Sequence, residues 1–164
     1  KLIFMGTELA QWREWNHDSS LDWHLLEYSE HLSFLTFMRE LGAVYRRSPA
    51  LWRADHDAGG FSWIDANDRT NSVFSYLRRA GNEEIIAILN LTPVARADYR
   101  VGVPRAGRYE LLLNSDESRF GGGGGEMQSA VWTDQHGSHG MEQSFRLTLP
   151  ALGALVLRHA GAND

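Results

Sequence analysis

The stretch "SFRLTL", residues 144–149, alternates polar and apolar side chains at every position. In an extended strand Phe145, Leu147 and Leu149 would share one face, because successive side chains point to opposite sides. The polar residues would share the other face. This is the pattern of a strand with one face on a core and the other in water, and it favours an antiparallel sheet.

Six further segments have the composition of short strands and are separated by turn signals. The turns are "DAGG" at 57–60, "ND" at 67–68, "AGN" at 80–82 and "PRAG" at 104–107, with Pro150 before the last strand. Several strands at this spacing without an intervening helix predict an antiparallel β-sandwich over residues 56–164. The predicted strands are residues 61–66, 72–79, 84–91, 99–103, 108–113, 143–149 and 154–159.

The first 55 residues follow a different pattern. "KLIFMG", residues 1–6, is a continuous apolar run, which is typical of a strand buried on both faces of a parallel sheet. Residues 29–48 place apolar side chains at helical spacing and predict an amphipathic helix that ends before Pro49. Strand, loop and helix make one β/α unit. Such a strand needs parallel neighbours, so we expect the chain to be a fragment of a longer protein, with a domain boundary near residue 55.

Composition excludes several classes of function. The chain has 164 residues, a formal net charge of −5 and scattered basic residues, so nucleic acid is not an expected partner. It has no cysteine, which excludes disulfides and fits a cytoplasmic location. No apolar run approaches the roughly 20 residues of a membrane span, and no membrane partner is expected.

The loop after the first predicted strand has the most unusual composition. "QWREWNHDSSLDWHLLE", residues 11–27, holds Trp12, Trp15 and Trp23 among many acids and amides. An indole can stack on the apolar face of a sugar while neighbouring polar groups bind its hydroxyls. The alternative is that the three rings fold inward and fasten the loop, and the sequence leaves both open. The acids could include a glycosidase pair, but caps, turns and salt bridges are the favoured interpretation.

Three other motifs carry weaker signals. Asp134, His136 and His139 could form a metal set, but a loop rich in Gly and Ser is a poor scaffold, so we predict a solvated loop and no metal site. The run "FGGGGGEM", residues 120–127, lacks the Lys-Ser/Thr of a phosphate loop and is interpreted as a flexible surface loop. No cofactor is predicted.

"FMGTELAQWREWNHDSSLDWHLLE", residues 4–27, resembles the end of the catalytic barrel of the 1,4-α-glucan (glycogen) branching enzymes, in the α-amylase superfamily. The similarity continues through "FSWIDANDRTNSVFSYLRR", "ILNLTPVARADYRVGVPRAGRYELLLNSD" and "RFGG", and covers nearly the whole chain. It implies a mainly β fold: the last β/α unit of a (β/α)8 barrel over residues 1–55, then a C-terminal antiparallel β-sandwich of the α-amylase type over residues 56–164.

The resemblance also implies an activity. These enzymes are retaining transferases that cleave an α-1,4-glucan and pass the segment to a 6-hydroxyl, creating the α-1,6 branches of glycogen. Their catalytic carboxylates lie on earlier barrel strands, which would precede Lys1. We therefore expect no catalytic residue here and no activity from the isolated chain. The implied partners are an α-glucan and the rest of the barrel.

The resemblance carries over residue by residue to the rim of the glucan cleft. Glu8 matches the last-strand motif and is expected to organise the active site from its floor. Trp15 and Trp23 are expected to pack or stack. The residues expected to shape and brace the cleft are Glu8, Gln11, Trp12, Trp15, Asn16, Asp18, Asp22 and Trp23.

A competing hypothesis makes the sandwich a carbohydrate-binding module that uses Trp52, Trp63 or Trp132. It requires these rings to be exposed to solvent.

A physical consequence of fragmentation is also expected. Residues 2–5 and the apolar helix face of residues 34–45 would lose their cover, so they should pack on the sandwich or on a second copy of the chain.

Overall fold

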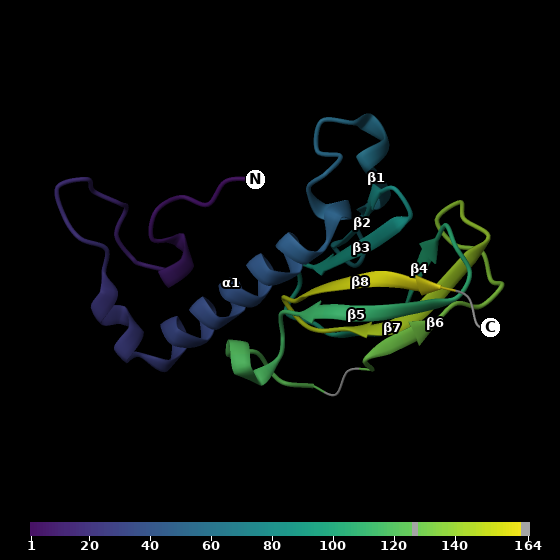
Figure 1. The fold of residues 1–164 in the computed structure, drawn as a ribbon. Helices are drawn as coiled ribbons and strands as arrows, with labels where there is room; N and C mark the ends of the chain where they lie inside the picture. The colour runs from purple at the N-terminus through teal and green to yellow at the C-terminus, as the bar shows by residue number, and fades with distance from the viewer. Residues whose placement is uncertain (126–127, 162–164) are drawn as a thin grey trace.

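The computed structural model describes residues 1–125 and 128–161. Figure 1 shows one long helix, α1 (Ser29–Arg47), between an N-terminal segment of loops and a β domain. The helix begins where the sequence predicted and ends one residue earlier. Its last turn carries Arg46 and Arg47, which favour the negative end of the helix dipole. None of the described helices is long and apolar enough to cross a membrane.

The predicted strand at residues 1–6 is wrong. Residues 1–4 are irregular, and the segment continues into two short 3-10 helices, η1 (Thr7–Leu9) and η2 (Trp23–Glu27). An extended segment becomes a strand only when a neighbour shares its hydrogen bonds, and no strand among the described residues lies beside it. Leu2 is 91% exposed, so this apolar run does not pack on the sandwich. Self-association stays a prediction.

The β domain has the predicted mainly antiparallel architecture, with every strand pair antiparallel. A six-stranded sheet has the order β1-β2-β3-β8-β5-β6, and β4 and β7 form a second sheet. The strands are β1 (Phe61–Asp68), β2 (Val73–Ala80), β3 (Glu83–Asn90), β4 (Arg96–Val103), β5 (Arg108–Asn114), β6 (Ala130–Trp132), β7 (Gln143–Leu149) and β8 (Ala154–Gly161).

All seven predicted strands are present, with two differences. Strand β6 was not predicted, because three residues are too few to show a pattern. Strand β4 begins three residues before the predicted start, since a register irregularity between Arg96 and Tyr99 lets it continue through Asp98, whose φ is 54°.

The main core lies between the two sheets. Phe145, Leu147 and Leu149 of "SFRLTL" point into it, while Arg146 and Thr148 are exposed, as the alternation predicted. Ser144 is buried instead of exposed, because its hydroxyl bonds Asp134. From the large sheet the core receives Ile64, Val73, Leu77, Ile86, Ile88, Tyr109, Val131, Leu155 and Leu157.

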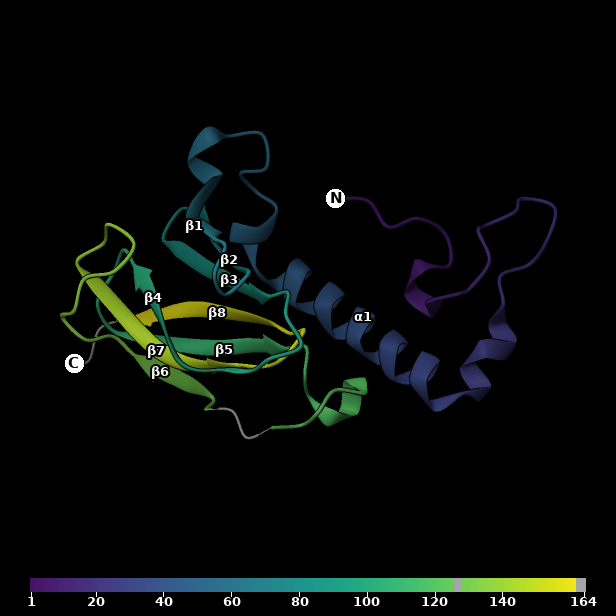
Figure 2. The same cartoon turned by 180° about the vertical axis from the view of Figure 1, so that it is seen from behind.

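A second, smaller apolar cluster joins α1 to the outer face of the large sheet. Val44 of the helix is fully buried there with Leu113 of β5 and Phe120. Phe37 meets Phe120 edge to face, with the ring centroids 5.4 Å apart. The C-terminal half of α1 therefore packs on the sandwich. Figure 2 shows that its other half and residues 6–28 lie away from the sheets. The N-terminus turns back, and Lys1 bonds Asp55, which also pairs with Arg78 of β2.

Candidate functional site

The rim loop, defined here as residues 6–23, begins at a glycine that no other residue could replace without strain. Gly6 has a φ of 86°, and a Cβ at this position would lie 2.3 Å from Cδ of Gln11. Gln11 donates its backbone N–H to the Gly6 carbonyl at 3.5 Å and its side-chain amide to the Arg13 carbonyl at 3.0 Å. Gly6 and Gln11 thus fix the direction in which the loop departs.

An ion pair between Arg13 and Asp22 closes the rim loop. The Arg13 guanidinium donates to both carboxylate oxygens of Asp22, and the Nε–Oδ2 distance is 3.3 Å. Asp22 is buried, and Arg13 lowers the pKa of its carboxyl through these bonds. Asn16 accepts the N–H of Asp18 at 2.9 Å and forms an Asx-turn within the loop. These are the local bracing bonds that the sequence favoured for the acids.

The three tryptophans of the rim loop do not behave alike. Trp15 is half-buried, and its ring meets Phe4 edge to face at 5.8 Å, above a polar hollow of about 150 Å³ that Arg13 and Asp22 also line. Trp12 is 84% exposed and Trp23 is 54% exposed. One ring therefore folds inward and two face solvent, so each of the two alternatives describes part of the loop.

Beside Trp12 the loop meets the first turn of α1. Nδ1 of the buried His31 donates to the Leu9 carbonyl at 2.8 Å, which ties η1 to the helix. The rings of Trp12 and His31 lie 5.8 Å apart, and an open hollow of about 390 Å³ lies between Trp12, His31, Tyr28 and Phe34. This aromatic hollow was not predicted, because its residues come from two separate segments.

Glu8 is placed in η1, at the start of the rim loop, and is half-buried. Its carboxylate makes no hydrogen bond or ion pair within the part of the chain that the structure describes. Unlike Asp22, it does not brace this segment.

The three residues considered as metal ligands, Asp134, His136 and His139, take part in structural hydrogen bonds and ion pairs instead. Asp134 pairs with Arg100 at 2.7 Å, and this guanidinium lowers the pKa of Asp134 to about 2. Nδ1 of His139 accepts the Gly102 N–H at 3.0 Å. No group of three or more His, Cys, Asp or Glu in residues 1–125 and 128–161 could hold a metal ion. In the glycine run, Gly123 donates to Asp116 at 2.7 Å, and residues 126–127 lie outside the described residues.

All three tryptophans proposed for a binding module are partly exposed: Trp52 by 41%, Trp63 by 52% and Trp132 by 48%. Trp63 differs from the other two because it lies among Phe61, Phe74 and Tyr76. Sequence reasoning missed this group. The signal was present in the alternate positions 61, 63, 74 and 76, but it needed the pairing of β1 with β2.

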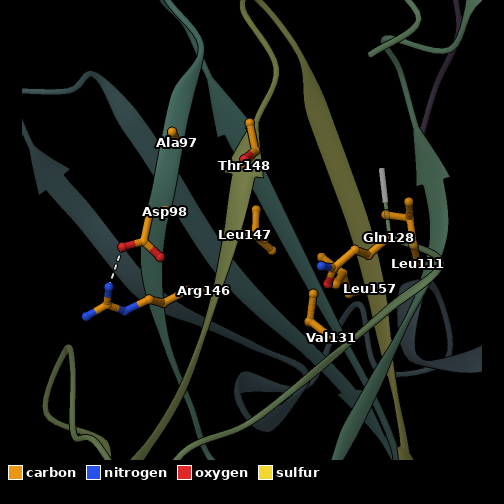
Figure 3. Close-up of a pocket in the computed structure, with 9 residues that line it drawn as sticks. All are labelled: Ala97, Asp98, Leu111, Gln128, Val131, Arg146, Leu147, Thr148 and Leu157. Carbon is orange, nitrogen blue, oxygen red and sulfur yellow. Dashed lines mark hydrogen bonds and ion pairs between the residues drawn. The ribbon is translucent and has the colours of Figure 1, made fainter. Parts of the chain in front are cut away.

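A hollow of about 440 Å³ opens at the edge of the small sheet (Figure 3). Core residues such as Leu111, Leu147 and Leu157 line it, and Asp98 pairs with Arg146 at its rim. The charged groups at the rim neutralise each other. Apart from this ion pair, the described lining is apolar except for Gln128 and Thr148.

Known proteins resemble the chain along nearly its whole length. The family model "Alpha amylase, C-terminal all-beta domain" matches residues 63–160. The 1,4-alpha-glucan branching enzyme GlgB of Pseudomonas aeruginosa is 48% identical over 162 residues, which cover 98% of this chain and 22% of the relative. The same-named enzyme of Cupriavidus pinatubonensis is 46% identical, with the same coverage. The chain thus spans about a fifth of the length of these curated relatives.

Among solved structures, the debranching enzyme of Nostoc punctiforme matches 94% of this chain and 27% of its own, with a TM-score of 0.60 and 22% identity. At that identity the similarity establishes the fold. The matched region includes more than the sandwich.

Proposed function

Since the chain belongs to the alpha amylase C-terminal all-beta domain family, we propose that it is the C-terminal part of a 1,4-α-glucan branching enzyme. The observation that carries the proposal is the extent of the similarity. It covers 98% of the chain at 46–48% identity, and so includes the rim loop, α1 and the sandwich together. A cytoplasmic location, which the absence of cysteine favours, belongs to the same proposal.

The reaction would be a retaining glycosyl transfer. A carboxylate attacks the anomeric carbon, a second group protonates the leaving oxygen, and the same group then activates a sugar hydroxyl as acceptor. The acids of the rim loop suit another role, because Asp22 is neutralised by Arg13 and Asp18 lies at the surface. We assign the nucleophile and the acid/base to the rest of the parent enzyme, and the wall of the glucan cleft to the rim loop.

Within this wall the residues have different tasks. Gln11, Asn16 and the Arg13–Asp22 pair hold the shape of the loop, to which Asp18 contributes its backbone N–H, and Trp15 packs inward. Trp12 and Trp23 present exposed rings on which a sugar can stack. Glu8, whose carboxylate is not used within the described chain, contacts the catalytic floor.

The sandwich supports this wall through α1 and through ion pairs. Asp55 bonds both Lys1, at 2.7 Å, and Arg78 of β2. These cations lower the pKa of Asp55 to about 2. The residues that we assign to the end of the barrel, 1–55, are therefore attached to the sandwich by an apolar cluster and by a charge cluster. We propose that the sandwich holds the last barrel unit in position.

The full-length enzyme that contains this chain provides the test. Trp15→Ala removes the ring that packs inside the rim loop, and we expect the rate of α-1,6 linkage formation to fall by about tenfold to a hundredfold, because displaced cleft walls misplace the substrate. Arg108→Ala, at a surface ion pair with Glu110, is the control and should keep the parent rate. Equal, parent-like rates for both variants would reject the cleft role of the loop.

A further inference from the structure

His31 lies at the junction of the rim loop and α1, where its side chain is buried. It belongs to the first turn of α1 and is 8% exposed. Its Nδ1 lies 2.8 Å from the carbonyl oxygen of Leu9, the last residue of η1. A carbonyl oxygen only accepts hydrogen bonds, so Nδ1 carries a proton and donates it. This bond joins two segments that are 22 residues apart in the sequence.

Two aromatic side chains pack near the imidazole of His31. Its ring centroid is 5.8 Å from that of Trp12 and 6.3 Å from that of Tyr28, with interplanar angles of 55° and 62°. The rings and the bond to Leu9 together restrict the rotation of the imidazole. A side chain that positions other groups needs its own orientation to be fixed in this way.

The bond to Leu9 holds the part of the rim loop from which Glu8 departs. Leu9 is fully buried, and its N–H donates to the Gly6 carbonyl at 3.0 Å. In the described residues the Leu9 carbonyl accepts from His31 alone. The peptide planes on both sides of Leu9 are therefore anchored, and the second of them depends on His31. Without His31 this carbonyl would lose its partner, at a cost in free energy that favours local opening.

His31 also supports the ring of Trp12, the most exposed tryptophan of the rim loop. Trp12 is 84% exposed, so little packing restrains it. Within the part of the chain that the structure describes, the imidazole is its aromatic neighbour. A small side chain in place of His31 would remove this contact and enlarge the hollow of about 390 Å³ beside Trp12. One residue thus restrains both ends of the segment from Glu8 to Trp12.

The helix connects this contact to the sandwich. Val44, near the C-terminal end of α1, is packed on the large sheet, whereas His31 lies at the N-terminal end. We propose that His31 is a positioning residue for the branching reaction, which holds Glu8 and Trp12 in place at the wall of the glucan cleft. The role in the reaction rests on the proposed function, whereas the contact itself rests on the geometry of His31.

Two substitutions in the full-length enzyme separate the two ring nitrogens. The amide nitrogen of Asn can take the place of Nδ1 and donate to the Leu9 carbonyl, whereas Gln places its amide near Nε2. We expect His31→Ala and His31→Gln to lower kcat for α-1,6 linkage formation by about tenfold, because small displacements of cleft groups are costly. His31→Asn should stay within about twofold of the parent rate, since the donor is retained.

His136→Ala is the control, because the His136 side chain is exposed on the sandwich and makes no hydrogen bond in the described chain. It should keep the parent rate. The midpoint of sandwich unfolding should be the same in all four variants, since His31 lies outside the sandwich. A general loss of stability would change this midpoint, and it would not distinguish Asn from Gln at residue 31.

Amide hydrogen exchange of the 164-residue chain tests the contact without reference to branching. The N–H groups of residues 9–11 donate to the carbonyls of Gly6 and Thr7, and their exchange should accelerate by about tenfold in His31→Ala but not in His31→Asn. Parent-like kcat in His31→Ala, a kcat in His31→Gln that equals or exceeds that of His31→Asn, or unchanged exchange in His31→Ala would each overturn the proposal.

The branching assay on Trp15→Ala separates this proposal from the proposed function. If His31→Ala keeps the parent rate while Trp15→Ala does not, the positioning role of His31 fails and the cleft role of the rim loop stands. If both variants keep the parent rate, the cleft role fails too.

Discussion

The sandwich and the rim loop are held together by different forces. The sandwich has a continuous apolar core with many fully buried side chains, including Phe145, Leu77 and Ile86. In the rim loop Leu9 is the fully buried apolar side chain, and the shape depends on hydrogen bonds and on the Arg13–Asp22 pair. The comparison shows that stability and the proposed substrate contacts reside in separate parts of the chain. A substitution in the rim loop should therefore have little effect on the stability of the sandwich.

The largest effect should come from the core. Phe145→Ala removes a fully buried ring whose centroid lies 5.2 Å from that of Tyr109. We expect the free energy of unfolding to fall by about 3–5 kcal/mol. Thr148→Ala, exposed on the same strand, should change it by less than about 0.5 kcal/mol. Urea unfolding followed by tryptophan fluorescence measures both. Similar losses in the two variants would mean that β7 does not separate a core face from a solvent face.

A smaller and local effect is expected in the rim loop. Asp22→Asn weakens the pair with Arg13, so amide hydrogen exchange over residues 11–23 should accelerate by about fivefold to tenfold, because this pair opposes local opening. The midpoint of sandwich unfolding should stay unchanged. Asp18→Asn is the control, since the Asp18 carboxylate contacts only the His17 ring, at 3.3 Å. Unchanged exchange in Asp22→Asn, or a shift in the unfolding midpoint, would contradict the separation of the two regions.

The smallest effect is a dependence on pH within the sandwich. Arg100 lowers the pKa of Asp134 from 3.8 to about 2, so the folded state binds this proton less readily than the unfolded state does. The corresponding stability is present above about pH 4 and is lost as the pH falls toward 2. Urea unfolding at several pH values should show a smaller acid loss in Asp134→Asn than in the parent chain. Glu142→Gln is the control, because Glu142 makes no ion pair in the described chain, and its stability should depend on pH as that of the parent chain does. The same pH dependence in all three proteins would show that Asp134 does not contribute to the loss of stability in acid.

The sequence predicted the sandwich well, because period-2 alternation and turn residues are local signals. The strand predicted at residues 1–6 is absent, since the composition of an apolar run does not show whether a neighbouring strand is present to pair with it. The sequence also could not predict that Trp15 packs inward while Trp12 faces solvent, because the packing of Trp15 depends on Phe4, eleven residues earlier. The grouping of Trp63 with Phe61, Phe74 and Tyr76 depends on the register of β1 with β2, including an irregularity after Trp63 that the sequence does not reveal.

The helix α1 gives the molecule a mechanical property. Its 19 residues form a rod of about 28 Å, clamped to the sheets at one end and attached to the rim loop at the other. A rod of that length acts as a lever: a tilt of about 2° at the clamp would move the far end by about 1 Å. Repacking around Val44 or Phe120, at the end of α1 that is remote from the rim loop, would therefore shift the position of the loop by a small amount.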